Sequence, residues 1–221
     1  PGAYRYPKLS PDNTRLALVR IEDGFKQDIW VFDFENQVLS RRTFTENVDS
    51  IVWSDDGNEL FYSQRRLRSE ATGDSVWKIN ADGSGQPELL YMSPDPALTI
   101  ILLTIPDNGS RLLFSQDTSG DPQLHDLTLD GSRVITPVGQ ESFSAFGAAV
   151  SSDGQWLSYS TFISGTYGSF VSPFPDVDSG LWQIGTGIIL PIPDRELNSL
   201  YGAGSTANTF VEARILGTSP F

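Results

Sequence analysis

The chain alternates between short apolar stretches and polar turns, and one such unit recurs along its whole length. Each copy consists of an apolar stretch, a turn built around Asp, and a second apolar stretch. Two apolar stretches joined by a tight polar turn predict an antiparallel β-hairpin. The first stretch and turn of the five copies are residues 6–13, 51–57, 103–108, 149–154 and 190–195.

The spacing of the copies predicts the size of the repeating unit. Residues Asp12, Asp56, Asp107, Asp153 and Asp194 follow one another at intervals of 44, 51, 46 and 41 positions. Intervals of this length fit one four-stranded blade of a β-propeller. The expected third strands are residues 28–34, 75–80, 123–129 and 169–174. Shorter and more polar fourth strands, as expected at the outer edge of a blade, are residues 39–44, 88–91, 133–136 and 181–185.

The turns have a local physical explanation. Pro or Ser before the Asp favours a type I turn, and the residue after the Asp takes a left-handed conformation that Asn or Gly adopts at little cost. The fifth copy has Arg195 at this position, so we expect its hairpin to be irregular. We assign a structural role in the turns to Asp12, Asn13, Asp56, Gly57, Asp107, Asp153, Gly154 and Asp194.

These patterns predict an all-β chain that forms a single β-propeller domain of four-stranded blades. About five blades are visible, with expected bounds of 1–45, 46–91, 92–138, 139–187 and an incomplete 188–221. The fifth blade stops near its third strand, which gives about nineteen strands, whereas a closed propeller needs whole blades. We therefore expect further blades, and any targeting segment, to lie in sequence outside these 221 residues.

Composition and charge exclude several classes of protein. The absence of cysteine excludes disulfide scaffolds, thiolate zinc sites, iron–sulfur clusters and cysteine nucleophiles. The 15 Lys and Arg against 28 Asp and Glu give a net charge of −13, which disfavours nucleic acid as a partner. The longest apolar run, residues 98–105, is far shorter than the roughly 20 residues of a transmembrane helix. No cofactor is expected.

The Ser-Pro-Asp-Gly-like turns between apolar strands resemble the WD-repeat-like, TolB-like propeller repeats of bacteria. A longer series of segments is similar to the C-terminal propeller of membrane-anchored bacterial Ser/Thr protein kinases and related periplasmic proteins. Those segments are residues 4–12, 28–33, 42–45, 173–175 and 182–187. The resemblance implies a six-bladed, extracytoplasmic sensing or docking module without catalytic activity. Residues 187–194 depart from the family pattern, which continues with Gly-Gly and a Trp-containing turn.

No residue pattern predicts a catalytic or metal site. His125, the single histidine, is followed by Asp126, but adjacent residues of a strand point to opposite faces, so we interpret His125 as structural. The turn aspartates could form a ring of carboxylates on one rim, yet their role in the turns explains their recurrence. Asp176 and Asp178 resemble the start of a calcium loop, although the Gly and Glu that complete such a loop are absent.

Two further sets of residues are candidates for binding. Arg65, Arg66 and Arg68 form the single basic cluster of this acidic chain, either as a solvated loop or as a docking point for an acidic partner or anionic headgroups. The five tryptophans are expected at matching positions of the blades, mostly in the core between blades, with an exposed lectin-like shelf as the alternative. They are Trp30, Trp53, Trp77, Trp156 and Trp182.

The sequence thus predicts a non-catalytic, extracytoplasmic propeller for protein–protein interaction or sensing. The expected partner is a protein of a larger membrane-associated assembly, on which the chain docks as an accessory subunit, or the rest of a longer chain. One alternative is the lid or substrate-binding domain of a hydrolase, which a hydrolase domain or perturbed carboxylates would reveal. Another is a glycan- or small-ligand-binding propeller, which exposed Trp or Tyr at the rim would reveal.

Overall fold

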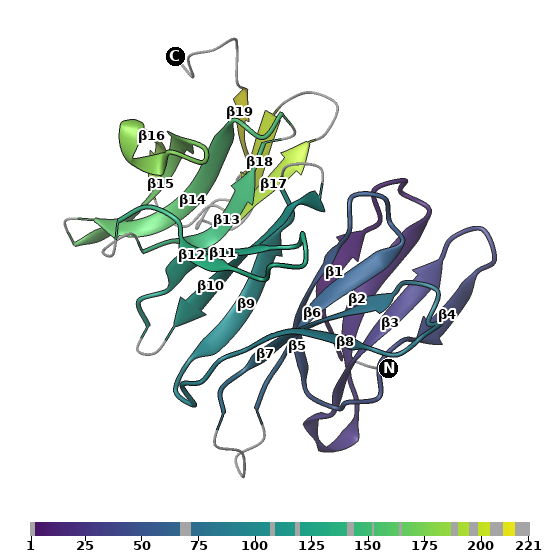
Figure 1. Ribbon diagram of the computed structural model, residues 1–221. Coiled ribbons are helices and arrows are strands. Elements are labelled where there is room, and N and C mark those ends of the chain that lie inside the picture. The colour runs from purple at the N-terminus through teal and green to yellow at the C-terminus, as the bar shows by residue number, and fades with distance from the viewer. Residues whose placement is uncertain are drawn as a thin grey trace. The chain divides into compact units, whose positions relative to one another are not determined.

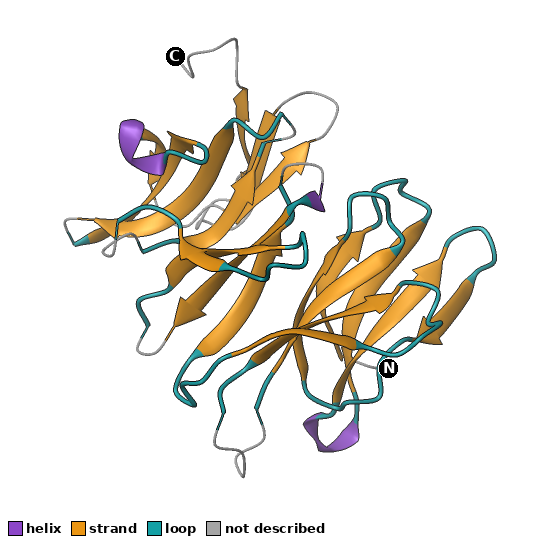
Figure 2. Ribbon diagram, in the orientation of Figure 1, coloured by secondary structure: helices purple, strands orange, loops and turns teal. Residues whose placement is uncertain are grey.

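Strands dominate the structure of the chain (Figure 1, Figure 2). The computed structural model describes residues 3–66, 72–106, 109–117, 120–140, 144–151, 153–163, 165–186, 190–194, 199–203 and 210–214. In this part of the chain helix is confined to short 3-10 turns such as η1 (Asp23–Phe25) and η3 (Val177–Ser179). The backbone pattern therefore matches the high content of Gly, Pro and aromatic residues, which favours short strands and tight turns.

Nineteen strands are found within the described ranges, and within each sheet the strands follow one another in sequence order. Four sheets contain four strands each, and the last contains three. The sheets have the orders β1-β2-β3-β4, β5-β6-β7-β8, β9-β10-β11-β12, β13-β14-β15-β16 and β17-β18-β19. This meander of four-stranded sheets is the arrangement that the repeat predicts.

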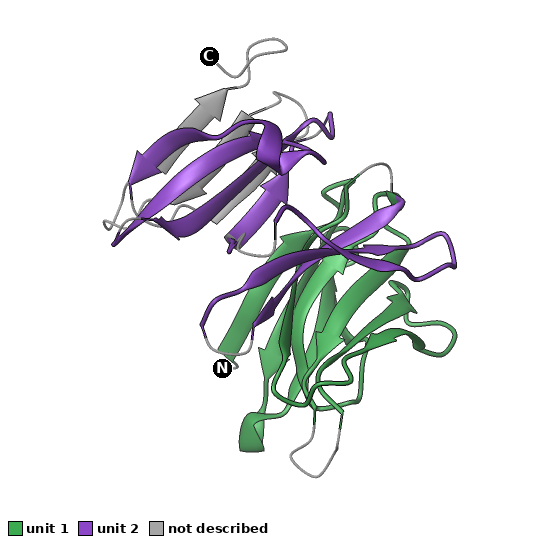
Figure 3. Cartoon of the chain, turned by 60° about the vertical axis from the view of Figure 1, so that its left-hand side comes forward, with its two compact units in different colours: residues 1–109 green, residues 110–221 purple. Residues whose placement is uncertain are grey.

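The chain divides into two compact units, residues 1–109 and 110–221 (Figure 3). The strands of the first unit are β1 (Ala3–Leu9), β2 (Arg15–Ile21), β3 (Gln27–Asp33), β4 (Val38–Arg41), β5 (Val48–Trp53), β6 (Glu59–Gln64), β7 (Ser75–Asn80), β8 (Glu88–Met92) and β9 (Thr99–Thr104). Those of the second are β10 (Arg111–Asp117), β11 (Gln123–Thr128), β12 (Ile135–Pro137), β13 (Phe146–Val150), β14 (Trp156–Ile163), β15 (Thr166–Pro173), β16 (Trp182–Thr186), β17 (Leu190–Asp194), β18 (Ser199–Ala203) and β19 (Phe210–Arg214).

The core of the first unit lies between its sheets. Val19, Ile29, Ile51, Leu60 and Tyr62 are all buried in one cluster that joins the sheet β1–β4 to the sheet β5–β8. Every residue of β5 is buried, so this strand is covered on both faces. Strand β9 packs in turn on β5 and β6. Burial of two-sided apolar strands between neighbouring sheets is the main favourable term for such a fold.

Three of the predicted turns share one hydrogen-bond pattern. In the second copy, Ser54 Oγ donates to Asp56 Oδ1 at 2.6 Å and accepts from Glu59 N at 2.9 Å. Asp56 Oδ1 also accepts from Asn58 N at 2.9 Å. The first and fourth copies repeat these three bonds around Asp12 and Asp153. The Asp carboxylate is thus held by the backbone of its own turn, which makes it a structural group.

The residue after each of these Asp residues has a left-handed backbone. The φ angles of Asn13, Gly57 and Gly154 are 58°, 72° and 72°. At Gly57 a Cβ atom would also lie 3.2 Å from Arg15 Nη2, which donates to the Gly57 carbonyl at 2.8 Å. Glycine is therefore favoured at position 57 both by its φ angle and by the close approach of an arginine from the preceding sheet.

The third and fifth copies differ because Ile105 and Ile192 stand where the other copies have Ser. Isoleucine has no hydroxyl group for the two bonds that the serine makes. In the fifth copy Asp194 is the last residue of β17, paired with Ser199, rather than a residue inside the turn. Asp107 of the third copy and residues 195–198 of the fifth lie outside the described residues.

The predicted positions of the tryptophans were wrong in part. Trp30 and Trp77 do occupy third strands, but Trp53 lies in a first strand, Trp156 in a second and Trp182 in a fourth. Trp53 and Trp156 are buried, and the other three are partly exposed. The five tryptophans therefore occupy all four strand positions of a blade, the third position twice, and do not follow the repeat.

Candidate interaction surface

Two loops of the first unit present large apolar side chains to solvent. Residues 22–26 join β2 to β3 and residues 42–47 join β4 to β5; together they are the aromatic loop pair. Phe25 is 85% exposed and Phe44 is 73% exposed. Among the large apolar side chains of the described residues these two rings are the most exposed. A ring that stays in water contributes little to folding, which makes both candidates for binding a partner.

The backbone of the first loop holds Phe25 in an unusual conformation. Phe25 has a φ of 63° and follows Gly24, whose φ is 80°. Hydrogen bonds from Phe25 N to the Glu22 carbonyl and from Glu22 N to the Lys26 carbonyl close the loop at 3.1 and 2.8 Å. A bulky residue with a left-handed backbone is strained, and such strain is typical of functional positions.

A buried aspartate organises the second loop. Asp28, at the start of β3, is 1% exposed and accepts four hydrogen bonds. The donors are Arg41 Nη2 at 2.6 Å, Thr43 Oγ1 at 2.7 Å, Thr45 N at 3.0 Å and Glu46 N at 3.3 Å. All four donors belong to the end of β4 or to the loop that follows it. Asp28 therefore fixes the path of the segment that carries Phe44.

The two loops are tied to each other. Lys26 Nζ bonds to Glu46 Oε1 at 2.5 Å, and Gln27 N donates to the Glu46 carbonyl at 3.0 Å. The Arg41 guanidinium lies 4.6 Å from the centroid of the Phe44 ring, which supports this ring on one side. The aromatic loop pair is accordingly a preorganised surface in which the backbones that carry both rings are held by a hydrogen-bonded frame.

The predicted basic cluster begins next to this surface. Arg65 N donates to the Asn47 carbonyl at 3.0 Å, which connects it to the second loop. Arg65 Nη2 lies 2.9 Å from Asp49 Oδ1, and Asp49 is 1% exposed. The Asp49 carboxylate raises the pKa of the Arg65 guanidinium. The charge of Arg65 is therefore already compensated by a buried carboxylate, while its half-exposed side chain stays accessible.

The next residue of the cluster contacts a second buried carboxyl group. Arg66 N donates to Asp74 Oδ1 at 3.0 Å, and Ile100 N donates to Asp74 Oδ2 at 3.1 Å. Burial raises the pKa of Asp74 above its usual range. Arg68 lies outside the described residues. A docking role of Arg65, Arg66 and Arg68 stays a prediction.

The other predicted candidates have structural contacts. His125 stacks on Phe114 with ring centroids 5.8 Å apart, and its Nδ1 lies 3.2 Å from the Gln123 carbonyl. Burial lowers the pKa of His125. It lines a shallow cavity of about 240 Å³ with Pro137 and Val138 among its walls. Asp178 lies in η3, and the described residues contain no cluster of three or more groups that could hold a metal ion.

Sequence reasoning missed Phe25 and Phe44. The available signal was an aromatic residue inside each of two otherwise polar connections, Glu22–Lys26 and Arg42–Asn47. Phenylalanine is more often buried than exposed, so the pattern alone does not reveal that these two are exposed. Only the folded loops show that both rings point to solvent.

The turn aspartates make a pH-dependent contribution that can be tested at Asp56. The hydrogen bonds from Ser54 and Asn58 lower the pKa of the Asp56 carboxyl to about 2. Because the pKa in the folded chain is below that in the unfolded chain, the stabilisation is complete above about pH 4 and is lost as the pH falls toward 2. We expect Ser54→Ala to raise the Asp56 pKa, measured by NMR titration of the side-chain carboxyl carbons.

Ser54→Thr, which keeps the hydroxyl group, is the matched control and should leave the Asp56 pKa low. An unchanged pKa in Ser54→Ala would show that the hydroxyl group does not hold the carboxylate.

Comparisons with known proteins define the class of fold. No protein-family model matches the sequence, and no curated protein sequence matches it. Among solved structures, TolB from Acinetobacter baumannii is similar with a TM-score of 0.75 and 14% identity, over 96% of this chain and 51% of that chain. The chain thus spans about half the length of that TolB chain.

Two other solved structures extend this likeness. A chain of a nidogen/laminin complex matches with a TM-score of 0.69 and 12% identity, over 96% of this chain and 76% of that chain. The β-propeller domain of the trilobed protease from Pyrococcus furiosus matches with a TM-score of 0.65 and 12% identity, over 99% of this chain and 70% of that chain. The fold is therefore an all-β, TolB-like β-propeller of several blades. The nearer resemblance to kinase propellers stays a prediction.

Proposed function

We propose that the chain is a non-catalytic protein-interaction module of an extracytoplasmic assembly and that the aromatic loop pair is its docking surface. The observation that carries this proposal is the exposure of Phe25 and Phe44 on two loops that are held in place by buried groups. Aromatic side chains on preorganised loops lose little conformational entropy on binding, and aromatic residues dominate the energetics of many interfaces.

The charges around the loop pair indicate the chemistry of the partner. Lys26, Arg41 and Arg65 each have a carboxylate partner within the first unit, in Glu46, Asp28 and Asp49. The positive charges of these three side chains are thus compensated by carboxylates at this surface. We propose a partner protein with an apolar pocket for the two rings and polar groups around it, bound mainly by apolar contact and only weakly affected by salt.

The likeness to protein-binding and protease propellers supports an interaction role without identifying the partner. One matched structure is a complex of nidogen with laminin, and another is the propeller of a protease. The likeness to the protease propeller favours one alternative, in which this propeller serves a hydrolase domain outside these 221 residues. Two of the five tryptophans are buried and the other three are only partly exposed, which gives the glycan-binding alternative little support. No helix among the described residues is long and apolar enough to span a bilayer.

Site-specific photocrosslinking tests the proposal. With a photoreactive phenylalanine analogue at position 25 or 44, we expect an adduct with one envelope protein, identified by mass spectrometry. The Phe25→Ser/Phe44→Ser double variant should then bind the purified partner at least about tenfold more weakly, because each buried aromatic contributes roughly 1–2 kcal/mol. If the adduct contains a peptidase, the hydrolase alternative is supported instead.

Phe34 provides the matched control. It is an exposed phenylalanine at the opposite end of β3, directly after Asp33. The photoreactive analogue at position 34 should give no adduct, and Phe34→Ser should bind the partner like the parent chain. Equal crosslinking at positions 25 and 34, or equal affinity of the double variant and the parent, would contradict the proposal.

A further inference from the structure

The hairpin of β14 and β15 differs in chemistry from the corresponding hairpins of the chain. Residues 154–175 contain no Asp, Glu, Lys, Arg or His, although the chain as a whole has a net charge of −13. Each strand of the hairpins β2–β3, β6–β7 and β10–β11 carries at least one charged residue. An uncharged hairpin can enter an apolar phase without the large penalty of desolvating a charge.

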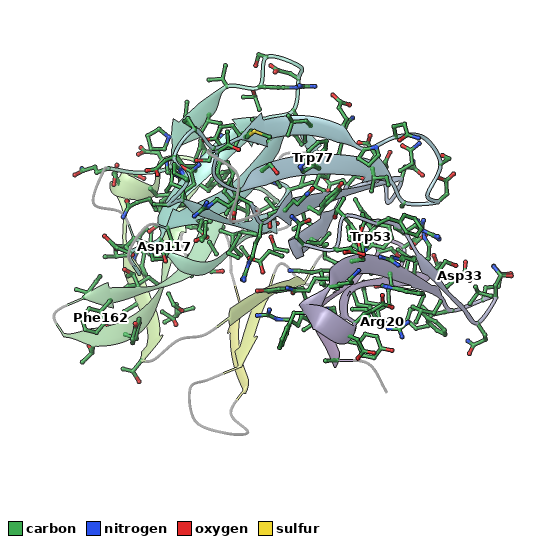
Figure 4. All side chains as sticks on the ribbon, turned by 90° about the horizontal axis from the view of Figure 1, so that it is seen from below. Arg20, Asp33, Trp53, Trp77, Asp117 and Phe162 are labelled. Atoms are coloured by element: carbon green, nitrogen blue, oxygen red, sulfur yellow. The ribbon has the colours of Figure 1, made fainter. Side chains whose placement is uncertain are left out.

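The end of this hairpin is apolar and exposed. Residues 162–163 and 165–167, here the aromatic tip, include Phe162, Ile163 and Tyr167 (Figure 4). Phe162 is 56% exposed. The residues that flank the tip, Thr161 and Gly168, are buried. The described part of the tip is therefore a small projection whose apolar side chains are not covered by the sheet.

The tip exposes apolar side chains on both faces of the hairpin. Phe162 pairs with Tyr167, and their ring centroids are 5.0 Å apart in an edge-on contact. Ile163 pairs with Thr166 at the next position. Successive residues of a strand point to opposite faces, so the ring pair lies on one face and Ile163 on the other. A projection with apolar side chains on both faces can be buried on both sides by lipid, whereas a flat protein surface would cover only one of its faces.

The backbone of the tip is compatible with such a medium. Pairing between the two strands continues to Ile163 and Thr166, so the backbone groups that the two strands turn toward each other are paired up to the turn. The pairing to β13 and β16 ends at Ser160 and Gly168, so the outer edges of the tip need polar neighbours, which the headgroup region of a bilayer provides and its hydrocarbon core does not. Two residues extend beyond Thr161, which gives a reach of about 7 Å at about 3.3 Å per residue. This length is within the roughly 5–10 Å to which interfacial segments enter a bilayer.

We propose that the aromatic tip inserts into the interfacial region of a lipid bilayer with zwitterionic headgroups. Phe and Tyr side chains partition well into this region, and the tip presents both. The acidic chain would be repelled by anionic headgroups, which favours a zwitterionic surface. The inference rests on the second unit alone and is independent of the partner proposed for the aromatic loop pair.

A single fluorescent label tests the insertion directly, because the chain contains no cysteine. Ile163→Cys labelled with an environment-sensitive nitrobenzoxadiazole probe should show a blue shift and stronger emission with phosphatidylcholine vesicles. Lipids with a spin label near the headgroup should quench this emission. Val38→Cys, at an exposed position of β4 in the first unit, is the matched control and should show no response.

Vesicle sedimentation with the full chain gives a second measurement. Phe162→Ser/Tyr167→Ser should lower the partition coefficient at least about tenfold, as expected for losing the burial of two aromatic rings. Phe25→Ser/Phe44→Ser should bind vesicles like the parent, and all variants should keep the parent's circular dichroism.

The proposal is overturned if the label at position 163 does not respond or if the tip variant binds vesicles like the parent. Stronger binding to anionic than to zwitterionic vesicles at low salt would overturn the assigned lipid chemistry. Dimerisation that depends on Phe162, without vesicle binding, would assign the tip to a second copy of this chain.

Discussion

Replacing Trp53 with alanine should lower the free energy of unfolding by about 3–5 kcal/mol, the range typical of deleting a large buried aromatic side chain. Trp53 is buried between the first two sheets (Figure 4). Its indole Nε1 donates to the Lys8 carbonyl at 2.9 Å, and the Arg15 guanidinium lies 5.0 Å from its ring centroid. The substitution thus removes apolar packing, a hydrogen bond and a cation–π contact together.

Urea unfolding followed by circular dichroism measures this loss for Trp53→Ala. Phe25→Ala is the control, because it removes an aromatic side chain that is almost fully exposed. It should unfold like the parent. Equal midpoints for the parent and Trp53→Ala would show that the interface between the first two sheets contributes little to stability.

Asp28→Ala should be about as destabilising, at roughly 3–5 kcal/mol, because it removes the partner of a largely buried arginine and leaves further donors unsatisfied. Arg41, Thr43 and the amides of Thr45 and Glu46 all lose their acceptor. The same substitution should release the loop that carries Phe44. We therefore expect faster hydrogen exchange at the Thr45 and Glu46 amides and weaker binding of the partner.

Two variants separate the effect of the Asp28 network from a general loss of charge. Asp28→Asn keeps one carbonyl acceptor and should lie between the parent and Asp28→Ala in stability. Asp33→Ala removes a carboxylate from the other end of β3 that accepts a hydrogen bond from Asn36 N at 2.8 Å, and should lower stability much less than Asp28→Ala. If the Thr45 and Glu46 amides exchange at the parent's rate in Asp28→Ala, the aspartate does not organise the loop.

The turn chemistry and the meander of short strands could be predicted from the sequence because each depends on residues close together in the chain. The Ser54 hydroxyl reaches only as far as Glu59, and the left-handed residue lies one position after the Asp. The predicted third strands agree with β3, β7, β11 and β15 to within a few residues. The all-β, TolB-like fold follows from the regular spacing of these local units.

The burial of individual side chains was decided by tertiary structure. Arg65 resembled a solvated loop residue in the sequence, but Asp49, which is 16 positions away, holds its guanidinium. Asp28 resembled an ordinary polar residue at the start of a strand, yet donors 13 to 18 positions away converge on it. These contacts require two connections to meet at one end of a sheet.

The alternation of apolar and polar residues also fails to predict burial where a strand is covered on both faces. In β5 the polar residues Asp49 and Ser50 are as buried as Val48 and Ile51. The opposite holds for Phe25 and Phe44, which are apolar and exposed. The sequence by itself therefore determined the strands and their turns through local hydrogen bonding and conformational preference. The packing of one sheet on the next decided which carboxylates are buried and which aromatic rings stay free to bind, because burial depends on neighbours that local sequence does not specify.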